Sequence, residues 1–181
     1  MDHHDHVALI RAGVEGAGNR WLELGAGEGA FTLALADVLG PGGRIEALDR
    51  DGHALEVAAA AVRSRFPSVA VLTTTADFTH ALPAGPFDGI LAANSLHFVR
   101  DRQGPLAAIR AALAPGGRLV IVEYDADRGN PWVPYPFSFE TWRREAMGAG
   151  FEGPRLLHRV PSRFLGGIYG AVAGRGGGGT P

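Results

Sequence analysis

The sequence predicts an α/β protein built around a mostly parallel sheet. From Arg20 onward, short apolar runs typical of buried strands alternate with amphipathic helical patterns, as in repeated strand–helix–strand units. A glycine-rich turn follows the first of these strands and leads into a helix. The link at Pro161-Ser162 between the last two apolar runs is too short for a crossover helix, so we expect those two strands to pair antiparallel.

The glycine-rich turn runs from Gly25 to Gly29. The apolar run Trp21 to Leu24 is consistent with a central strand, and alternate glycines after it remove each Cβ that would block a tight turn or a close ligand. Apolar residues at helical spacing begin at Phe31, so the turn feeds a helix N-terminus, whose unpaired amides favour electron-rich ligand groups. The sequence therefore predicts a ligand held close to the backbone here.

The later elements follow in order along the chain. Asp51 is expected to cap a helix that ends before Pro67. A second helix carries Leu106, Ile109 and Leu113, and Pro115-Gly116-Gly117 is expected to end it. Ser138 is expected to cap the last helix. The segment 77–82 is expected to be a short connection. The predicted strands after the first are Arg44 to Leu48 (ending at Asp49), Val69 to Thr73, Phe87 to Ala92, Leu119 to Tyr124, Arg155 to Val160 and Phe164 to Val172.

Two kinds of cofactor fit the glycine turn. Gly25-x-Gly27-x-x-Ala30 matches the relaxed dinucleotide fingerprint, so an NAD(P)-binding reductase is one alternative. Glu23 favours a different ligand, because a carboxylate expected at the tip of the strand would repel a pyrophosphate and attract an ammonium group. The chain also contains no lysine, so a Tyr-x-x-x-Lys proton relay is absent. A cationic nucleoside that bears an amino acid is the favoured ligand.

Length and composition indicate one domain in 181 residues, of which 46% are hydrophobic. We expect this domain to span residues 1–173, with residues 1–17 as an N-terminal cap segment, and residues 174–181 as a flexible Gly-rich tail. The chain has no cysteine, which excludes disulfides and thiolate nucleophiles.

Net charge and hydropathy limit the classes of partner that we expect for this protein. The formal net charge is -2 without a dense arginine run, so no nucleic acid is expected as a partner. The early apolar run Val7 to Ile10 is too short for a signal peptide or a membrane span, so we expect no membrane association. The absence of cysteine means that the chain needs no oxidising compartment, so we expect a cytoplasmic location. A monomer or homodimer is expected.

Five motifs in order resemble the class I S-adenosylmethionine-dependent methyltransferases of the bacterial small-molecule type, over about residues 18 to 173. The motifs are Leu22-Glu23-Leu24-Gly25-Ala26-Gly27-Glu28-Gly29, Asp49, Ala76-Asp77-Phe78, Pro86-Phe87-Asp88 with Asn94-Ser95-Leu96-His97-Phe98, and Leu113-Ala114-Pro115-Gly116-Gly117-Arg118. The resemblance implies a Rossmann-like, doubly wound sheet of seven strands in the order 3-2-1-4-5-7-6, with strand 7 antiparallel. It also implies S-adenosyl-L-methionine as cofactor, S-adenosyl-L-homocysteine as product and a small-molecule acceptor. The same resemblance implies that a short helix in the N-terminal cap segment lids the cofactor.

An RNA methyltransferase is the alternative within this resemblance. The acidic balance disfavours it, and Asn94-Ser95-Leu96-His97 stands where such enzymes carry an Asn-Pro-Pro-Tyr type motif.

The cofactor site is expected at the carboxyl edge of the sheet. Asp49 ends the second strand, where its carboxylate can accept both ribose hydroxyl protons. The resemblance assigns Asp77 to the adenine amino group and Phe78 to the ring, although Asp77 also fits an ordinary helix cap. The expected cofactor-binding residues are Glu23, Gly25, Ala26, Gly27, Gly29, Phe31, Asp49, Arg50, Ala76, Asp77, Phe78, Asn94 and Ser95.

His97 and Tyr124 are the catalytic candidates. His97 follows the fourth strand, at the crevice where open α/β sheets bind ligands, and imidazole titrates near neutrality, so it can act as a general base for a hydroxyl acceptor. The alternative is a histidine that packs and hydrogen-bonds behind the cofactor. Methyl transfer also proceeds by alignment and exclusion of water alone, so carbon and nitrogen acceptors stay open.

The loop 125–137 is the candidate acceptor site. Its prolines restrict the backbone, and its aromatic residues offer a surface for a flat or apolar acceptor. We expect Arg128, Trp132 and Tyr135 to bind substrate, with Phe137 adding to the aromatic surface; a rigid flap that completes the core is the alternative. The terminal run Asp2-His3-His4-Asp5-His6 is interpreted as a frayed end, so no metal site is expected.

Overall fold

The computed structural model describes residues 1–162 and 164–177. Its helices are α1 (His3–Val14), α2 (Ala30–Leu39), α3 (Gly52–Arg65), the 3-10 turn η1 (Leu96–Phe98), α4 (Gln103–Ala112) and α5 (Phe139–Gly148). Its strands are β1 (Arg20–Leu24), β2 (Arg44–Asp49), β3 (Ala70–Thr75), β4 (Phe87–Ala93), β5 (Leu113–Tyr124), β6 (Glu152–Ser162) and β7 (Gly166–Gly174).

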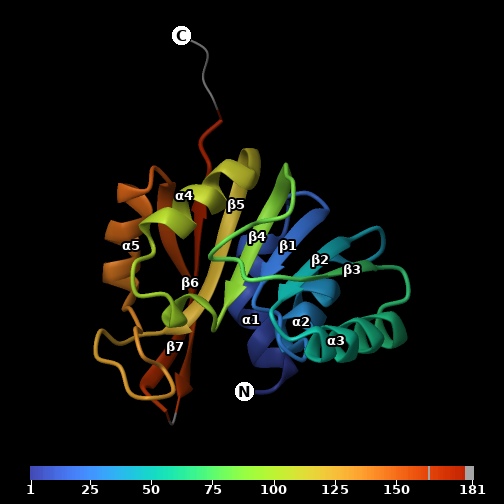
Figure 1. Ribbon diagram of the computed structural model, residues 1–181, viewed down its shortest axis with the longest axis horizontal. Coiled ribbons are helices and arrows are strands. Elements are labelled where there is room, and N and C mark those ends of the chain that lie inside the picture. Colours follow the sequence, from blue (N-terminus) through green and yellow to red (C-terminus); the bar gives the residue numbers. More distant parts are fainter. Residues whose placement is uncertain (163, 178–181) are drawn as a thin grey trace.

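The seven strands form one twisted sheet in the order β3-β2-β1-β4-β5-β7-β6, with helices on both faces (Figure 1). Strands β3, β2, β1, β4 and β5 pair in parallel, and β7 pairs antiparallel with both β5 and β6. The predicted order, the parallel core and the antiparallel last hairpin are confirmed. The carboxyl ends of β1, β2, β4 and β5 therefore meet at one edge of the sheet, where ligands bind in open α/β folds.

Two apolar layers fix the helices to the sheet. On one face, Trp21 and Val120 pack with Leu9 of α1 and Leu35 of α2; on the other, Leu22 packs in a layer with residues of α4 and α5. Successive residues of β1 thus enter opposite layers, as the pleat of a strand requires. Burial on both faces explains why the central strands read as continuous apolar runs.

Several boundaries differ from the sequence-based expectation. The helix before Pro115-Gly116-Gly117 ends earlier than predicted, at Ala112, and Leu113 already belongs to β5. The register of β5 against β4 shifts between Phe87 and Gly89, so the Pro-Gly-Gly segment forms an irregularity within the strand instead of a turn before it. The segment 77–82 contains no helix, as expected for a short connection, whereas β6 extends beyond its predicted range at both ends.

The two ends of the chain also differ from expectation. The buried face of α1 packs against α2 and the β5–β7–β6 side of the sheet, which makes this helix part of the core; its role as a cofactor lid stays a prediction. At the other end, Gly174 still belongs to β7, and the backbone of Arg175 exchanges hydrogen bonds of 2.7 and 2.9 Å with Gly117 and Gly116. The predicted tail thus begins after Arg175 at the earliest, and residues 178–181 lie outside the described residues.

Candidate active site

The glycine turn after β1 lies close to Ser95, just after β4, and to Ala58 of α3. Gly25, Gly27 and Gly29 all have positive φ, at 74°, 52° and 91°, which an L-residue adopts only with strain. A Cβ on Gly25 would lie 2.6 Å from the Cβ of Ser95, and one on Gly29 would lie 2.6 Å from the Cβ of Ala58. A Cβ on Gly27 would meet nothing within 4 Å. Two of these glycines therefore let protein segments approach each other, and Gly27 leaves open space at the turn.

Asp49 connects the end of β2 to this turn. Its carboxylate accepts hydrogen bonds from the backbone N–H of Gly27, at 2.8 Å, and from that of Asp51, at 3.0 Å. The backbone N–H groups of Gly25 and Ala26 donate to the carbonyl of Leu48, the preceding residue of β2. The carboxylate is thereby fixed at the mouth of the turn, and each of its oxygens keeps a lone pair for a ligand hydroxyl.

A cavity of about 370 Å³ lies at this edge of the sheet. Its size falls within the range of small-molecule sites. Its lining residues are Gly25, Asp49, Arg50, Ala76, Asp77, Phe78, Thr79, Asn94, Ser95, Phe98 and Val99. The first six and the pair Asn94 and Ser95 were all expected as cofactor-binding residues. Phe98 belongs to a quoted motif but was given no role, and Thr79 and Val99 were missed because no sequence pattern singles them out.

Five of the expected cofactor-binding residues do not line this cavity: Glu23, Ala26, Gly27, Gly29 and Phe31. Phe31 lies in the apolar layer between α1 and α2, where its ring is 4.6 Å from that of His6, so the structure gives it a core position. Glu23 lies one residue before the end of β1 and is buried on the same face, beside Thr32 of α2. The spacing of apolar residues in a helix or strand predicts that a side chain is buried, but it does not predict which residues or ligand the side chain packs against.

Glu23 is a buried acid with an unused hydrogen-bonding atom. Its Oε2 has no hydrogen-bond partner within the part of the chain that the structure describes. Burial raises the pKa of this carboxyl from 4.5 to about 8, the neighbouring Thr32 hydroxyl lowers it in part, and the charge of Asp49 raises it further. An unpaired polar atom in such a place is unfavourable unless a ligand satisfies it.

Asp77 and Arg50 stand at the opening of the cavity. One oxygen of Asp77 accepts from the backbone N–H and the hydroxyl of Thr79, at 2.9 and 2.6 Å, and these bonds lower the pKa of the Asp77 carboxyl. Its other oxygen lies 3.9 Å from a guanidinium nitrogen of Arg50, whose side chain is exposed. Asp77 caps its own turn instead of a helix, and its expected contact with an adenine stays a prediction.

Asn94 and Ser95 form a strained polar corner directly after β4. Asn94 has a φ of +52°, which makes it the single non-glycine residue with positive φ among those described. Its Oδ1 and the Oγ of Ser95 are buried and have no hydrogen-bond partner in residues 1–162 and 164–177. Backbone strain and unsatisfied buried polar atoms are typical of functional sites, where a ligand supplies the missing partner.

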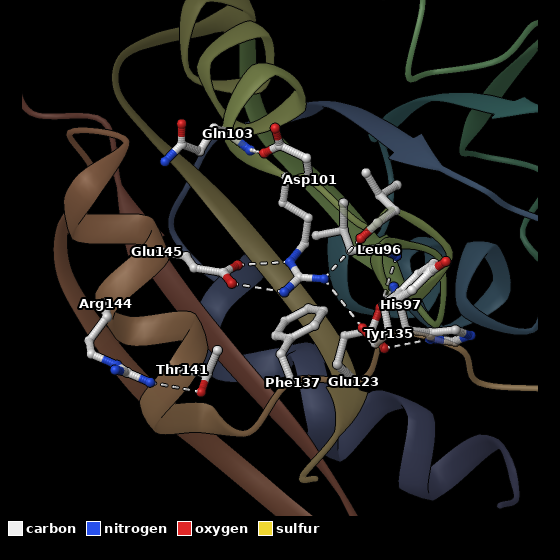
Figure 2. A network of polar contacts seen from close by, with 12 residues as sticks. Leu96, His97, Asp101, Gln103, Glu123, Tyr135, Phe137, Thr141, Arg144 and Glu145 are labelled. Atoms are coloured by element: carbon white, nitrogen blue, oxygen red, sulfur yellow. Dashed lines mark hydrogen bonds and ion pairs between the residues drawn. The ribbon is translucent and has the colours of Figure 1, made fainter. Parts of the chain in front are cut away.

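His97 forms a buried pair with Glu123, an acid of β5 that the sequence analysis did not single out. The ring Nδ1 of His97 lies 2.7 Å from Oε2 of Glu123. The other oxygen, Oε1, accepts from the backbone N–H groups of Leu96 and His97, at 2.9 and 3.2 Å. Figure 2 shows the imidazole with one nitrogen turned to Glu123 and the other turned away from it. The one signal in the sequence that could have identified Glu123 is that it is an acid within the otherwise apolar run of β5.

Aromatic rings continue outward from His97. The ring of Tyr124, the last residue of β5, lies 5.8 Å from that of His97, Phe164 lies 6.4 Å from Tyr124, and Trp132 lies 6.2 Å from Phe164. Phe98, Trp132 and Phe164 are 56%, 69% and 56% exposed, large values for such side chains. Burial and the charge of Glu123 raise the pKa of Tyr124, so its phenol stays protonated near neutrality.

The loop 125–137 is anchored to this site by its backbone. Asn130 Oδ1 accepts from the backbone N–H groups of Trp132 and Val133, and the N–H of Tyr135 donates to the carbonyl of His97 at 3.0 Å. Trp132 and Tyr135 are exposed, as expected, with Trp132 beside Phe164, and Arg128 is exposed near the start of the loop. Phe137 is fully buried, so the expectation that it adds to an aromatic surface is wrong.

The N-terminal histidines serve the fold. Asp2 caps α1 in a reciprocal pair with Asp5, and His3 lies 2.8 Å from Asp37 of α2. The interpretation of this run as a frayed end is therefore wrong. Among the described residues, no group of three or more metal-ligating side chains comes together, here or elsewhere.

The open space at Gly27, the fixed carboxylate of Asp49 and the unpartnered atoms of Asn94 and Ser95 all lie at the carboxyl edge of one doubly wound sheet. This arrangement defines a cofactor-binding α/β protein. Residues 22–119 match the methyltransferase domain family. The chain belongs to this family and to the class I S-adenosylmethionine-dependent methyltransferases.

Relatives and solved structures agree with this assignment. The chain is 30% identical over 128 residues to the ubiquinone/menaquinone biosynthesis C-methyltransferase UbiE of Ectopseudomonas mendocina, a match that covers 67% of this chain and 50% of that protein. It thus spans about half the length of the curated relatives it matches. YcgJ of Bacillus subtilis has a TM-score of 0.74 at 15% identity and covers 97% of this chain and all of its own. The CurJ carbon methyltransferase has a TM-score of 0.71 at 24% identity, over 88% of this chain and 49% of its own.

The described residues include no helix that is long and apolar enough to cross a membrane.

Proposed function

We propose that this protein transfers a methyl group from S-adenosyl-L-methionine to a small-molecule acceptor by in-line displacement at the carboxyl edge of the sheet. The observation that carries the proposal is the position of the buried His97–Glu123 pair, which lies directly after the Asn94–Ser95 corner of the cofactor cavity. The same short segment thus joins a cofactor site to a histidine held for proton transfer.

The residues around the cavity fit the methyl donor in chemical type. Asp49 offers a fixed carboxylate for two ribose hydroxyls, Asp77 and Phe78 offer an acceptor and a ring face for adenine, and Gly27 leaves room against the backbone. We assign the unpartnered oxygen of Glu23 to the ammonium group of the methionine part, because a buried carboxylate needs a cationic partner. The bound donor supplies an electrophilic methyl group on a sulfonium centre.

His97 serves as the general base. A carboxylate only accepts hydrogen bonds, so Glu123 selects the tautomer in which Nδ1 carries the proton and Nε2 is free to accept one. A hydroxyl or acidic C–H of the acceptor gives its proton to Nε2 as its oxygen or carbon bonds to the methyl carbon, and the electron pair of the breaking C–S bond stays on sulfur. Glu123 then stabilises the imidazolium. Tyr124, whose phenol is protonated, orients the acceptor as a hydrogen-bond donor.

The acceptor binds along the exposed rings beside His97. Trp132 and Tyr135 of the loop, together with Phe98 and Phe164, present apolar faces outside the pair, and Arg128 offers a charge farther out. Such a surface favours a flat or apolar acceptor over a nucleic acid, whose binding depends on many phosphate contacts. The carbon methyltransferases among the relatives are consistent with an acceptor carbon whose proton His97 removes.

Isothermal titration calorimetry with S-adenosylmethionine and S-adenosylhomocysteine tests the cofactor, and transfer of a labelled methyl group to a panel of phenols, quinols and β-keto compounds tests the reaction. We expect binding of both cofactor forms at micromolar concentrations, as is typical of enzyme ligands. If neither cofactor form binds at high micromolar concentration, the proposal fails. A cytoplasmic location and a monomeric or homodimeric state stay predictions.

A further inference from the structure

A single arginine joins the acceptor loop to the segment that carries His97. Arg102 lies immediately before α4, and its side chain is almost fully buried. Its guanidinium donates to both carboxylate oxygens of Glu145 in α5, at 2.7 and 2.8 Å. A bidentate pair of this kind is the most directional ion pair that proteins form.

The same guanidinium also binds two backbone carbonyls from different segments. Its Nη1 donates to the carbonyl of Val99, just after η1, at 2.9 Å and to the carbonyl of Tyr135, in the loop, at 3.2 Å. The guanidinium carbon lies 4.2 Å from the ring centroid of Phe137. Figure 2 shows Glu145, Phe137 and Tyr135 converging on this one group.

Tyr135 is thereby held at both of its backbone polar groups. Its carbonyl accepts from Arg102, and its N–H donates to the carbonyl of His97. A shift of the loop at this residue consequently pulls on the backbone of His97, whose own N–H is bound by Glu123. The guanidinium of Arg102 thus divides its hydrogen bonds: Nη1 binds the loop and the residue after η1, while Nε and Nη2 bind Glu145 of α5.

We infer that Arg102 is a positioning residue: with Glu145 it locks the acceptor loop 125–137 onto η1 and so sets the position of His97 relative to the acceptor surface. The functional part of this inference rests on the proposed methyltransferase activity, and the mechanical part does not. A lysine at this position would keep the positive charge. It would lose the planar guanidinium, whose several N–H donors bind Glu145 and the two backbone carbonyls at once.

Trypsin offers a direct probe of the loop. The chain contains no lysine, so every tryptic site is an arginine, and Arg128 is exposed within the loop. Cleavage after Arg128 follows the equilibrium opening of the loop when opening and closing are faster than cleavage. The variants are Arg102→Met, Arg102→Lys and Glu145→Gln, and Arg143→Met is the matched control, because Arg143 pairs with Glu140 on the exposed face of the same helix.

We expect cleavage after Arg128 to accelerate about tenfold or more in Arg102→Met, less in Arg102→Lys and Glu145→Gln, and not at all in Arg143→Met, since local opening rises with each lost contact. We also expect the imidazole NMR resonances of His97 to shift in the first three variants only. The inference is overturned if cleavage after Arg128 stays at the wild-type rate, if it rises only in step with all other arginine sites, or if the His97 resonances do not move.

Glu145→Gln preserves side-chain size and keeps the test decisive should Arg102→Met fail to fold. Titration with S-adenosylhomocysteine separates the two proposals. If wild-type protein does not bind it, the proposed function fails, yet the cleavage pattern still tests the lock. If the three variants at Arg102 and Glu145 bind it with wild-type affinity and lose loop protection, Arg102 acts on the acceptor side of the site and not on the cofactor side.

Discussion

The carboxylate of Glu123 holds His97 by its ring and by its backbone at once. Oε2 lies 2.7 Å from Nδ1 of the imidazole, and Oε1 accepts from the backbone N–H groups of Leu96 and His97. Both side chains are buried, so the interaction acts in a medium that screens charge poorly. The ring orientation and the tautomer are thus fixed by one acid.

Glu123→Gln is expected to reduce methyl transfer with little change in cofactor affinity. The amide N–H₂ can donate to Nδ1, which moves the ring proton to Nε2 and removes the base. Loss of a general base lowers rates by about 10²- to 10⁴-fold. Single-turnover methyl transfer and calorimetry with S-adenosylhomocysteine measure the two quantities separately. Normal turnover in this variant would instead support a packing role for His97.

Gly27→Ala is expected to block the cofactor without disrupting the fold. A Cβ at Gly27 meets no protein atom within 4 Å, so the methyl group would occupy only the space assigned to the ligand. Gly16 is the matched control, because it also has a positive φ, of 72°, and open space around it. Both variants should lose about 1–2 kcal/mol of unfolding free energy through backbone strain. Only Gly27→Ala should weaken binding of S-adenosylhomocysteine, and equal affinities would remove Gly27 from the site.

Asp49→Ala is expected to weaken cofactor binding by about 1 to 3 kcal/mol, through the loss of charge-assisted hydrogen bonds to the ribose. Because Asp49 also binds the backbone N–H of Gly27, the turn itself loosens. Asp51→Ala serves as the control, since Asp51 caps α3 through the N–H groups of His53 and Ala54 and does not line the cavity. Calorimetry should find near-normal affinity in Asp51→Ala. Unchanged affinity in Asp49→Ala would contradict the ribose assignment.

How far the sequence determines this site depends on the kind of residue. Gly25 and Asp49 were predictable because turn geometry and a strand end impose them locally. Glu123 was missed, since a lone acid within an apolar strand reveals burial but not its partner, which lies 26 positions away in sequence. Phe31 was assigned to the cofactor because helical periodicity identifies a buried face without naming what covers it. The residues that were predicted depend on local geometry, whereas those that were missed or misassigned depend on contacts between segments far apart in sequence, which only the fold brings together.

Glu23 makes stability depend on pH. With a folded-state pKa of about 8 against an ordinary value of 4.5, the folded protein retains a proton on Glu23 that the unfolded chain has lost in this window. The contribution of Glu23 to the free energy of unfolding therefore falls as pH rises from 4.5 to 8, by up to about 1.4 kcal/mol per pH unit, and levels off above it. Glu23→Gln should remove this slope in denaturant titrations at a series of pH values.

The same acid should couple cofactor binding to proton release. If the ammonium group of S-adenosylmethionine pairs with Glu23, binding below pH 8 must first ionise a carboxyl that is protonated in the free protein. Affinity should then rise with pH by up to about tenfold per unit until pH 8, because one proton leaves for each cofactor bound. Calorimetry in two buffers of different ionisation enthalpy measures that proton directly, with Glu23→Gln as the control that releases none. Equal heats in both buffers for the wild-type protein would place the ammonium group elsewhere.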